Sequence, residues 1–221
     1  MSVFKGVLAG IALAGIAFSA NAALIYSPVA ATASSEFGPM FGIDNTIDQS
    51  GLSDGFTSGV DDFDTFLALD PTHSFLPDTE WFTQAGVTTA TVVYDLGAIR
   101  NVFRLALWNE EVAGFASAQM STSVDGVTFT PLTTIMPADN PISVDYPAEV
   151  FDTAFNGRFF KLDIDDCPQP EANGAPNVFN GCAIGEVAVD AAIPLPASLL
   201  LLGTGVAAMA GFKHRFGKKS I

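Results

Sequence analysis

Six aspartates gather in the first third of the chain, and their type and spacing suit a bound cation. They fall within 21 residues of one another and are Asp44, Asp48, Asp54, Asp61, Asp62 and Asp64. Ca²⁺ takes about six to eight oxygen ligands from carboxylates and carbonyls in a flexible loop. The segment does not follow the ligand spacing of an EF-hand. It therefore predicts either an irregular calcium site or a solvated acidic loop.

A second set of residues suits sugar binding. Trp81, Phe82 and Trp108 lie at or beside expected loops, and their sequence neighbours include Glu80 and Glu110. Sugar rings stack their C–H faces on aromatic side chains while nearby polar groups bond the hydroxyls. Tryptophan is also highly buried on average, so both indoles could instead close off the core.

Catalytic chemistry finds little support in the residue pattern. The chain has two histidines, His73 and His214, and it contains no nucleophile-elbow, zinc-protease or phosphate-loop motif. Pairs of acids carry little weight for glycosidase chemistry in a chain with 24 acidic residues. The sequence predicts a protein that is not an enzyme.

The amino end is typical of a secretory signal peptide. A short basic start is followed by an apolar stretch over 6–19 and by the small residues Ala20-Asn21-Ala22. Cleavage there would make Ala23 the first mature residue. A membrane anchor is the alternative, although the stretch is short for spanning a bilayer. We therefore assign residues 1–22 to a signal.

The carboxyl end, residues 193–221, combines a proline motif, an apolar run and a basic end. The run over 198–212 is followed by Lys213 and Arg215, and the motif itself is Pro194, Leu195, Pro196 and Ala197. A buried core helix is the alternative, but a core helix gives no reason for basic residues on one side only. If this helix enters a membrane, the positive-inside rule predicts that its basic end lies at the cytoplasmic face.

The stretch IPLPASLLLLGTGVAAMAGFKHR resembles the VPLPA variant of the PEP-CTERM sorting signal, with Ile193 in place of valine. The resemblance implies a Gram-negative exported protein that an exosortase cuts near the motif. It also implies passage through the inner membrane to the cell surface or to an exopolysaccharide matrix of a biofilm.

Charge is distributed very unevenly along the chain. All 24 acids lie between the two terminal segments, whereas only four basic residues do: Arg100, Arg104, Arg158 and Lys161. Such a surface repels nucleic acid and anionic lipid. An acidic surface of this kind suits the binding of divalent cations, or it simply keeps the protein soluble outside the cell.

The chain has two cysteines, Cys167 and Cys182, and the loop between them is rich in proline, glycine and asparagine. An exported chain favours their pairing. A metal thiolate or a reactive thiol would need a nearby histidine or cysteine that the sequence lacks. We therefore predict a disulfide that closes this loop.

Residues 23–192 form one region long enough for a single domain with its own core. Five segments in it have strand character: 89–97, 102–109, 120–132, 157–165 and 183–190. Phe103, Leu105 and Leu107 are expected on one strand face, and Asp125-Gly126 is a hairpin turn signal. Because no stretch keeps a helical period, these segments predict an all-β sandwich.

The order of these segments is similar to that of the discoidin, or coagulation factor type C, domain. The matching pieces are Ala33-Ser34-Ser35, Ile43-Asp44-Asn45, Asp95-Leu96-Gly97, Ser123–Phe129, Gly157-Arg158-Phe159 and Glu186. The resemblance implies a galactose-binding-like jelly roll. It also implies a structural calcium ion between Asp44 and Glu186, to which the acidic segment adds Asp48. The acidic segment after Asn45 is longer than the family pattern and departs from it.

Together these features predict an exported surface or matrix protein that binds carbohydrate without catalysis. Its expected partners are an exosortase-type enzyme, extracellular polysaccharide and, transiently, the membrane, with no nucleic acid. The alternative is a structural matrix protein without a ligand, whose sorting and charge are its function.

Overall fold

The computed structural model describes residues 23–170 and 178–192. The expected signal peptide 1–22 and sorting segment 193–221 lie outside these residues. In the described part, no helix has the length and apolar character needed to cross a bilayer. The elements in chain order are β1 (Leu24–Tyr26), β2 (Ala30–Ala33), η1 (Pro39–Phe41), η2 (Ile43–Thr46), α1 (Phe63–Leu67), β3 (Thr72–His73), η3 (Pro77–Thr79), β4 (Trp81–Phe82), β5 (Ala90–Asn109), β6 (Ser117–Ser123), β7 (Thr130–Ile135), β8 (Tyr146–Pro147), β9 (Glu149–Asp165) and β10 (Ala183–Ala192).

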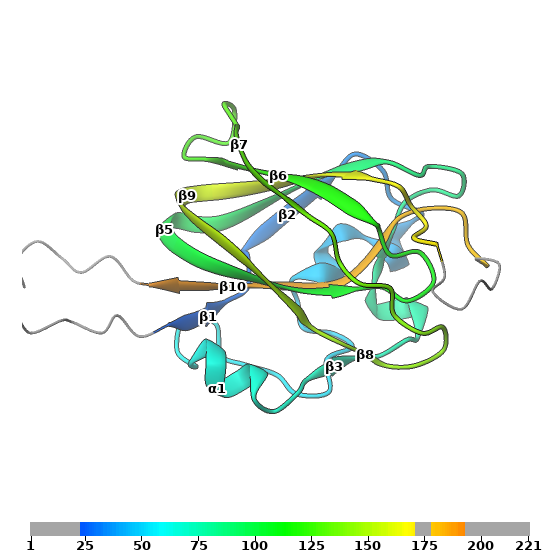
Figure 1. Cartoon of the computed structure of the whole chain (residues 1–221), viewed down its shortest axis with the longest axis horizontal. Coiled ribbons are helices and arrows are strands. Elements are labelled where there is room, and N and C mark those ends of the chain that lie inside the picture. The colour runs from blue at the N-terminus through cyan, green and yellow to red at the C-terminus, as the bar shows by residue number, and fades with distance from the viewer. Residues whose placement is uncertain (1–22, 171–177, 193–221) are drawn as a thin grey trace, which may run out of the picture.

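The two longest strands bend sharply and so serve both layers of an antiparallel sandwich (Figure 1). The first half of β5 pairs with β2 and the last half of β9, whereas its second half pairs with β10 and the first half of β9. The pairing of β5 with β9 shifts register between Asp95 and Arg100, which marks the bend. Gly97 lies there with φ of 73°, a left-handed conformation that glycine adopts without steric cost.

This geometry gives the molecule two distinct ends. The bend end holds Leu96–Arg100 and Asn156–Arg158, and there the start of β1 pairs with the finish of β10 (Leu24 with Ala191). The loop end holds Ala90 and Asn109, the two ends of β5. It lies at the right of Figure 1, where β10 also begins.

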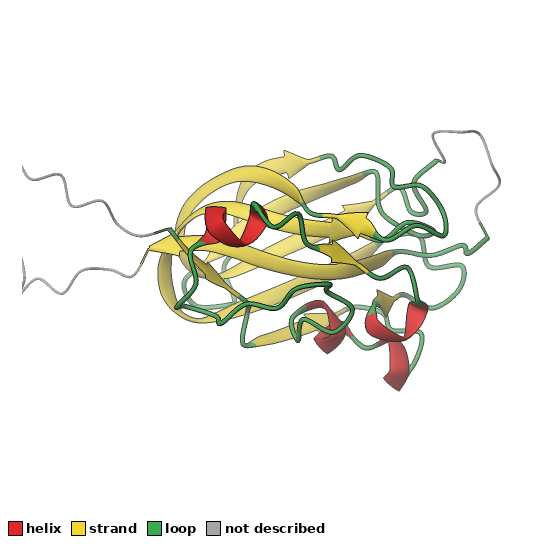
Figure 2. Ribbon diagram, turned by 90° about the horizontal axis from the view of Figure 1, so that it is seen from below, coloured by secondary structure: helices red, strands yellow, loops and turns green. Residues whose placement is uncertain are grey.

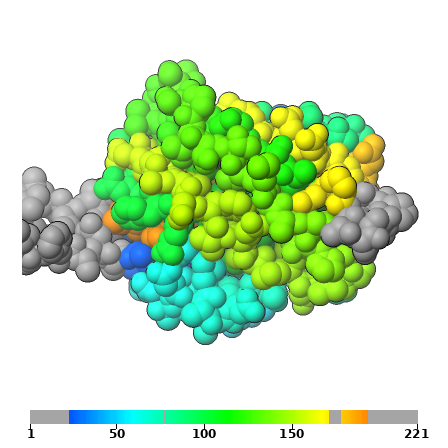
Figure 3. Space-filling view, in the orientation of Figure 1, coloured from blue at the N-terminus to red at the C-terminus, as the bar shows by residue number. Residues whose placement is uncertain are grey.

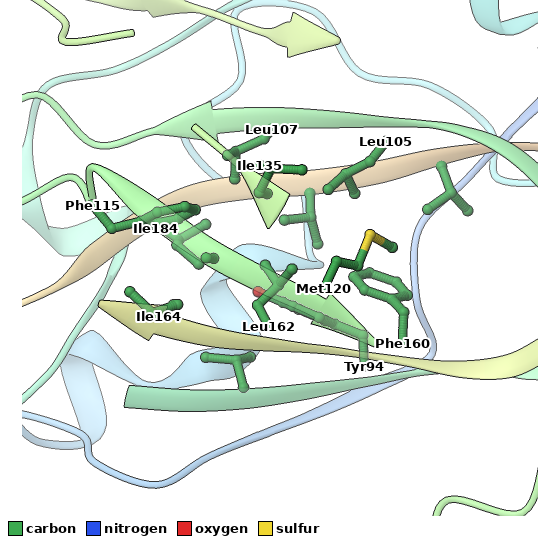
Figure 4. Packing of buried hydrophobic residues seen from close by; sticks show 14 of the residues in the cluster. Tyr94, Leu105, Leu107, Phe115, Met120, Ile135, Phe160, Leu162, Ile164 and Ile184 are labelled. Carbon is green, nitrogen blue, oxygen red and sulfur yellow. The ribbon is translucent and has the colours of Figure 1, made fainter. Parts of the chain in front are cut away.

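The core lies between the two layers, as the alternation of apolar residues requires. Tyr94 of β5 stacks on Phe160 of β9 with ring centroids 4.8 Å apart. Figure 4 shows these rings with the residues that surround them, Leu105, Leu107, Phe115, Met120, Ile135, Leu162, Ile164 and Ile184. Each large apolar side chain buried in this way contributes about 1.5–3 kcal/mol. The all-β sandwich predicted from the sequence is confirmed.

One expected strand face is wrong in part. Leu105 and Leu107 are fully buried, but Phe103 is 43% exposed. In the pairing with β10, Val102 lies opposite Ala191 and Arg104 opposite Asp190. Phe103 is therefore an extra residue on β5, and Val102 takes the inward position instead.

The short helices lie outside the strands (Figure 2). The segment with α1, cyan in Figure 3, covers the lower side of the sandwich. Asp62 caps α1 by accepting a hydrogen bond from the Thr65 N–H at 2.8 Å. This bond is the main reason why the pKa of the Asp62 carboxyl is lowered. Asp64 pairs with Arg104 at 2.7 Å. These acids of the aspartate-rich segment therefore have structural roles.

Candidate functional site

A pocket of about 420 Å³ opens at the loop end. Five segments that are distant in the sequence form its wall, and β4 joins this wall to the sandwich because Phe82 pairs with Ala183 of β10. Ligand pockets of proteins usually enclose about 300–1,000 Å³ and are mostly apolar. The aromatic part of the wall consists of Phe37, Phe41, Phe75, Phe82 and Phe179.

Four of these rings hold one another in a closed set of edge-to-face contacts. Phe82 meets Phe41 at 5.6 Å and Phe179 at 5.3 Å between centroids. Phe37 meets the same two rings at 5.5 and 5.8 Å. Aromatic pairs favour this geometry. The Phe37 N–H also donates to the Phe82 carbonyl at 2.8 Å, so the aromatic wall is formed before any ligand arrives.

Part of the wall faces solvent. Phe37 is 49% exposed and Phe75 is 38% exposed, whereas Phe82 is only 7% exposed. Phe75 is placed by its backbone N–H, which donates to an Asp145 carboxylate oxygen at 3.2 Å. The outer rings can therefore offer a face to a ligand, and the inner ring supports them.

Two glutamates, Glu110 and Glu111, follow β5 directly and line the same pocket. Each is 3% exposed. A carboxylate oxygen of Glu110 accepts hydrogen bonds from the backbone N–H groups of Val112, at 2.9 Å, and of Ala113. The turn after β5 thus presents acidic side chains beside the aromatic wall.

A buried polar cluster lies near these glutamates. It contains His73, Glu80 and Tyr146, all with no solvent exposure. The Tyr146 hydroxyl donates to Oε1 of Glu80 and lies 3.0 Å from Nδ1 of His73. Burial, followed by the charge of Glu110, raises the pKa of Glu80 to about 9, and burial lowers the pKa of His73. At neutral pH this cluster is therefore a neutral hydrogen-bonded unit rather than an ion pair.

The structure corrects the assignment of Trp81 and Trp108 to a sugar-stacking surface. Both side chains are fully buried. Their indole N–H groups donate to the carbonyls of Ser35 and Pro71, each at 3.0 Å. A buried indole with a satisfied donor has no face left for a ligand, so both tryptophans belong to the core. Phe82 does line the pocket, although it is nearly buried.

Sequence reasoning did not find Phe37, Phe75 and Phe179. A signal was present, since the chain has 19 phenylalanines and only two tryptophans, and these three lie in segments without strand alternation. Their convergence depends on the fold and could not be read from spacing.

The predicted disulfide between Cys167 and Cys182 is confirmed, with Cα atoms 5.0 Å apart and a dihedral angle of 96°. Next to it, the Thr83 N–H donates to the Cys182 carbonyl at 2.9 Å. Phe179 lies within the loop that the disulfide closes. The crosslink therefore restricts one wall of the pocket.

The residues expected to bind calcium are only partly brought together. Glu186 is fully buried; its Oε2 accepts from the Gln49 N–H at 2.8 Å, and its Oε1 has no hydrogen-bond partner within the described residues. Burial raises the pKa of Glu186 strongly, and the charge of Asp48 adds to this. Asp44 is exposed on η2. In residues 23–170 and 178–192 no three acids, histidines or cysteines form a metal-binding group. Glu186 and Asp48 lie close enough for the charge of one to act on the other.

Comparisons with known proteins give solved structures only. No family model matches the chain, and no curated protein does. A CBM32 module from Clostridium perfringens in complex with GalNAc-β-1,3-galactose is 14% identical, with a TM-score of 0.49, covering 73% of this chain and 94% of that one. A chitosan-binding module from a Paenibacillus chitosanase/glucanase is 19% identical, with a TM-score of 0.48, covering 75% and 98%. The CBM32 of AlyQ in complex with 4,5-unsaturated mannuronic acid is 19% identical, with a TM-score of 0.46, covering 75% and 97%.

Proposed function

We propose that this protein is a non-catalytic carbohydrate-binding module and that the loop-end pocket takes the sugar. The observation that carries the proposal is the preformed wall of phenylalanine rings beside two buried glutamates. The exposed faces of Phe37 and Phe75 suit the apolar face of a pyranose ring. Glu110 and Glu111 supply acceptors for hydroxyl groups that leave water on binding.

Export and sorting belong to the same proposal. The signal peptide over 1–22 and the tail over 193–221 would deliver the module to the cell surface or to a polysaccharide matrix, after exosortase processing at the motif. Exported protein is expected to begin at Ala23 and to lack Lys213–Ile221. Intact-mass measurement decides this, because an outer fraction that still carries the basic end would indicate a permanent anchor.

A second function has a specific observation in its favour. The burial of Trp81 and Trp108 removes the most strongly stacking side chains from any binding surface. A matrix protein without a ligand would have the same core and the same charge. The pocket, which such a protein does not need, favours the binding function.

The test is binding of residues 23–192 to a panel of immobilised glycans, followed by Phe37→Ala and Phe75→Ala. Each substitution removes a half-exposed ring and is expected to lower affinity about 5- to 30-fold, the equivalent of about 1–2 kcal/mol. Phe103→Ala is the matched control, because Phe103 is 43% exposed on β5 and does not line the pocket. Equal affinity for all three variants would place the sugar elsewhere.

A further inference from the structure

The charge around the pocket restricts which sugars it can take. Among the described residues that line the pocket, Glu110 and Glu111 are the only ones with an ionisable side chain. Both are almost buried in a wall that is otherwise mainly apolar. Two carboxylates in such a wall gain from a cation, because few water molecules are available to solvate them.

The basic residues of the protein are engaged elsewhere. Within the described ranges 23–170 and 178–192 there are four lysines and arginines, none of which lines the pocket. Arg104 pairs with Asp64 and Asp190, Arg158 with Asp95, and Lys161 with Asp163, all at 2.6–2.7 Å. The fourth, Arg100, lies over the Tyr26 ring at 3.8 Å.

Of the neighbouring acids, Asp78 makes the local field more negative, whereas Glu80 holds a proton at neutral pH. Burial is the main cause that raises the pKa of Glu80, and the charges of Glu110, Glu111 and Asp78 add to it. Asp78 is exposed on η3, in the same loop cluster as Phe75. The charges of Glu110, Glu111 and Asp78 therefore act together on any charge that enters the pocket.

The aromatic wall gives a cation a second attraction. The face of a phenylalanine ring carries negative potential and attracts ammonium groups within about 6 Å. Phe37 and Phe75 present partly open rings beside the two glutamates. An ammonium group placed between ring and carboxylate would gain from both at once.

We infer that the sugar taken by this pocket carries a protonated amine, so that the ligand is an amino-sugar polysaccharide with free amino groups. The inference rests on the proposed function and specifies its substrate class. A neutral sugar would use the rings but gain nothing from the charge of the two glutamates. A uronic acid polymer would bring like charges to Glu110 and Glu111, which costs binding free energy.

The test compares three oligosaccharides of equal length by titration calorimetry with residues 23–192, slightly below neutral pH. The probes are a glucosamine oligomer, the same oligomer fully N-acetylated, and a uronic acid oligomer. We expect the free amine to bind at least about tenfold more tightly than the acetylated form, as one charge-assisted contact provides. The uronate is expected to bind weakest.

Variants locate the effect. Glu111→Gln keeps the shape of the side chain and is expected to remove most of the preference for the amine over its acetylated counterpart. Asp70→Asn is the control for net charge, because Asp70 is exposed and does not line the pocket. Asparagine also tolerates its left-handed φ of 55°. Thermal melting checks that both variants fold.

Each outcome separates the inference from the proposed function. Equal binding of the amine and its acetylated form by the wild-type protein overturns the inference, while the carbohydrate-binding function stands. Tightest binding of the uronate also overturns it. Absence of binding to every glycan overturns both. The order of the three probes on the wild-type protein needs no variant, so a misfolded Glu111→Gln leaves the test intact.

Discussion

The two ends of the sandwich treat their acidic residues in opposite ways. At the bend end, Arg158 forms a two-point contact with Asp95 at 2.7 and 2.8 Å, and Arg104 joins Asp64 to Asp190. At the loop end, Glu80, Glu110 and Glu111 lie close enough to affect one another, and no arginine or lysine is among the described residues that line the pocket.

This difference separates stability from function. At the bend end the pair of Asp95 and Arg158 joins β5 to β9, and Arg104 joins β5 to α1 and β10. The acids of the loop end are buried against apolar side chains, an arrangement that costs free energy unless a proton, a metal ion or a cationic ligand neutralises it. Under the function proposed above, a cationic ligand of the loop-end pocket would relieve this cost.

The largest effect is expected from the crosslink at the loop end. Removing the disulfide with the double variant Cys167→Ser and Cys182→Ser should lower the free energy of unfolding by about 3 kcal/mol, the chain-entropy value for a loop of this length. Because Phe179 lies inside that loop, glycan binding should weaken as well. Chemical denaturation and calorimetry measure the two effects. A loss of stability without any loss of binding would show that the disulfide does not shape the pocket.

A bound calcium ion would neutralise the carboxylates of Glu186, on β10, and Asp48. We propose that Glu186 and Asp48 bind Ca²⁺, because the orphaned Oε1 of Glu186 is buried close to the charge of Asp48. At a hundredfold excess over the dissociation constant, binding adds about 2.7 kcal/mol to stability. The melting temperature should rise with Ca²⁺ and fall with chelator, and Mg²⁺ should substitute poorly.

The control for this site is Glu186→Gln, which keeps the acceptor for the Gln49 N–H. This variant should fold in calcium-free buffer and lose most of the response to Ca²⁺. If the wild-type protein and the variant melt alike with calcium and with chelator, the two acids bind no calcium.

At the bend end, the comparison predicts a dependence on one arginine. The side chain of Asp190 is 3% exposed and accepts from Nε of Arg104 at 2.6 Å. Arg104→Met should cost about 2 kcal/mol, because it leaves a buried carboxylate without its charged donor. Asp64→Asn removes only the partner that is 65% exposed, and it should cost less than about 1 kcal/mol. If denaturation curves show the same loss of unfolding free energy for both variants, burial does not determine how much the pair of Arg104 and Asp190 contributes to stability.

The strands of both ends could be predicted from the sequence more readily than the site. Alternation of apolar and polar residues along a strand predicts which side chains face the core. In β9 the apolar positions are Phe160, Leu162 and Ile164, and all three are buried. The same reasoning failed at Phe103, where a bulge changes the alternation and nothing in the local sequence marks it.

The site could not be predicted because it depends on contacts between distant segments. Trp81 and Trp108 flank loops, and sequence alone does not tell whether such an indole points inward. Phe37 and Phe179 are separated by most of the domain and meet only after β4 pairs with β10. The disulfide was predictable because two cysteines in an exported chain allow only one pairing.

The smallest effect, per unit of pH, concerns protons, and the two ends should again respond in opposite directions. The contact of Asp95 with Arg158 lowers the pKa of Asp95, so the stability that this pair contributes is present above about pH 4 and is lost as the pH falls further.

At the loop end, burial and the neighbouring glutamates raise the pKa of Glu80 to about 9. Between about pH 4.5 and 9 the folded protein therefore holds a proton on Glu80 that the unfolded chain has released. The folded state should therefore lose stability as the pH rises through this interval. Melting temperatures measured from about pH 7.5, one unit above the ordinary pKa of histidine, up to pH 9 should fall steadily, because His73 is then largely neutral in both states. Glu80→Gln can still accept from Tyr146 and should flatten this decline, whereas Asp95→Asn should change only the acid side of the profile. A Glu80→Gln variant with the same alkaline slope as the wild-type protein would show that the buried acids of the loop end do not determine its pH response.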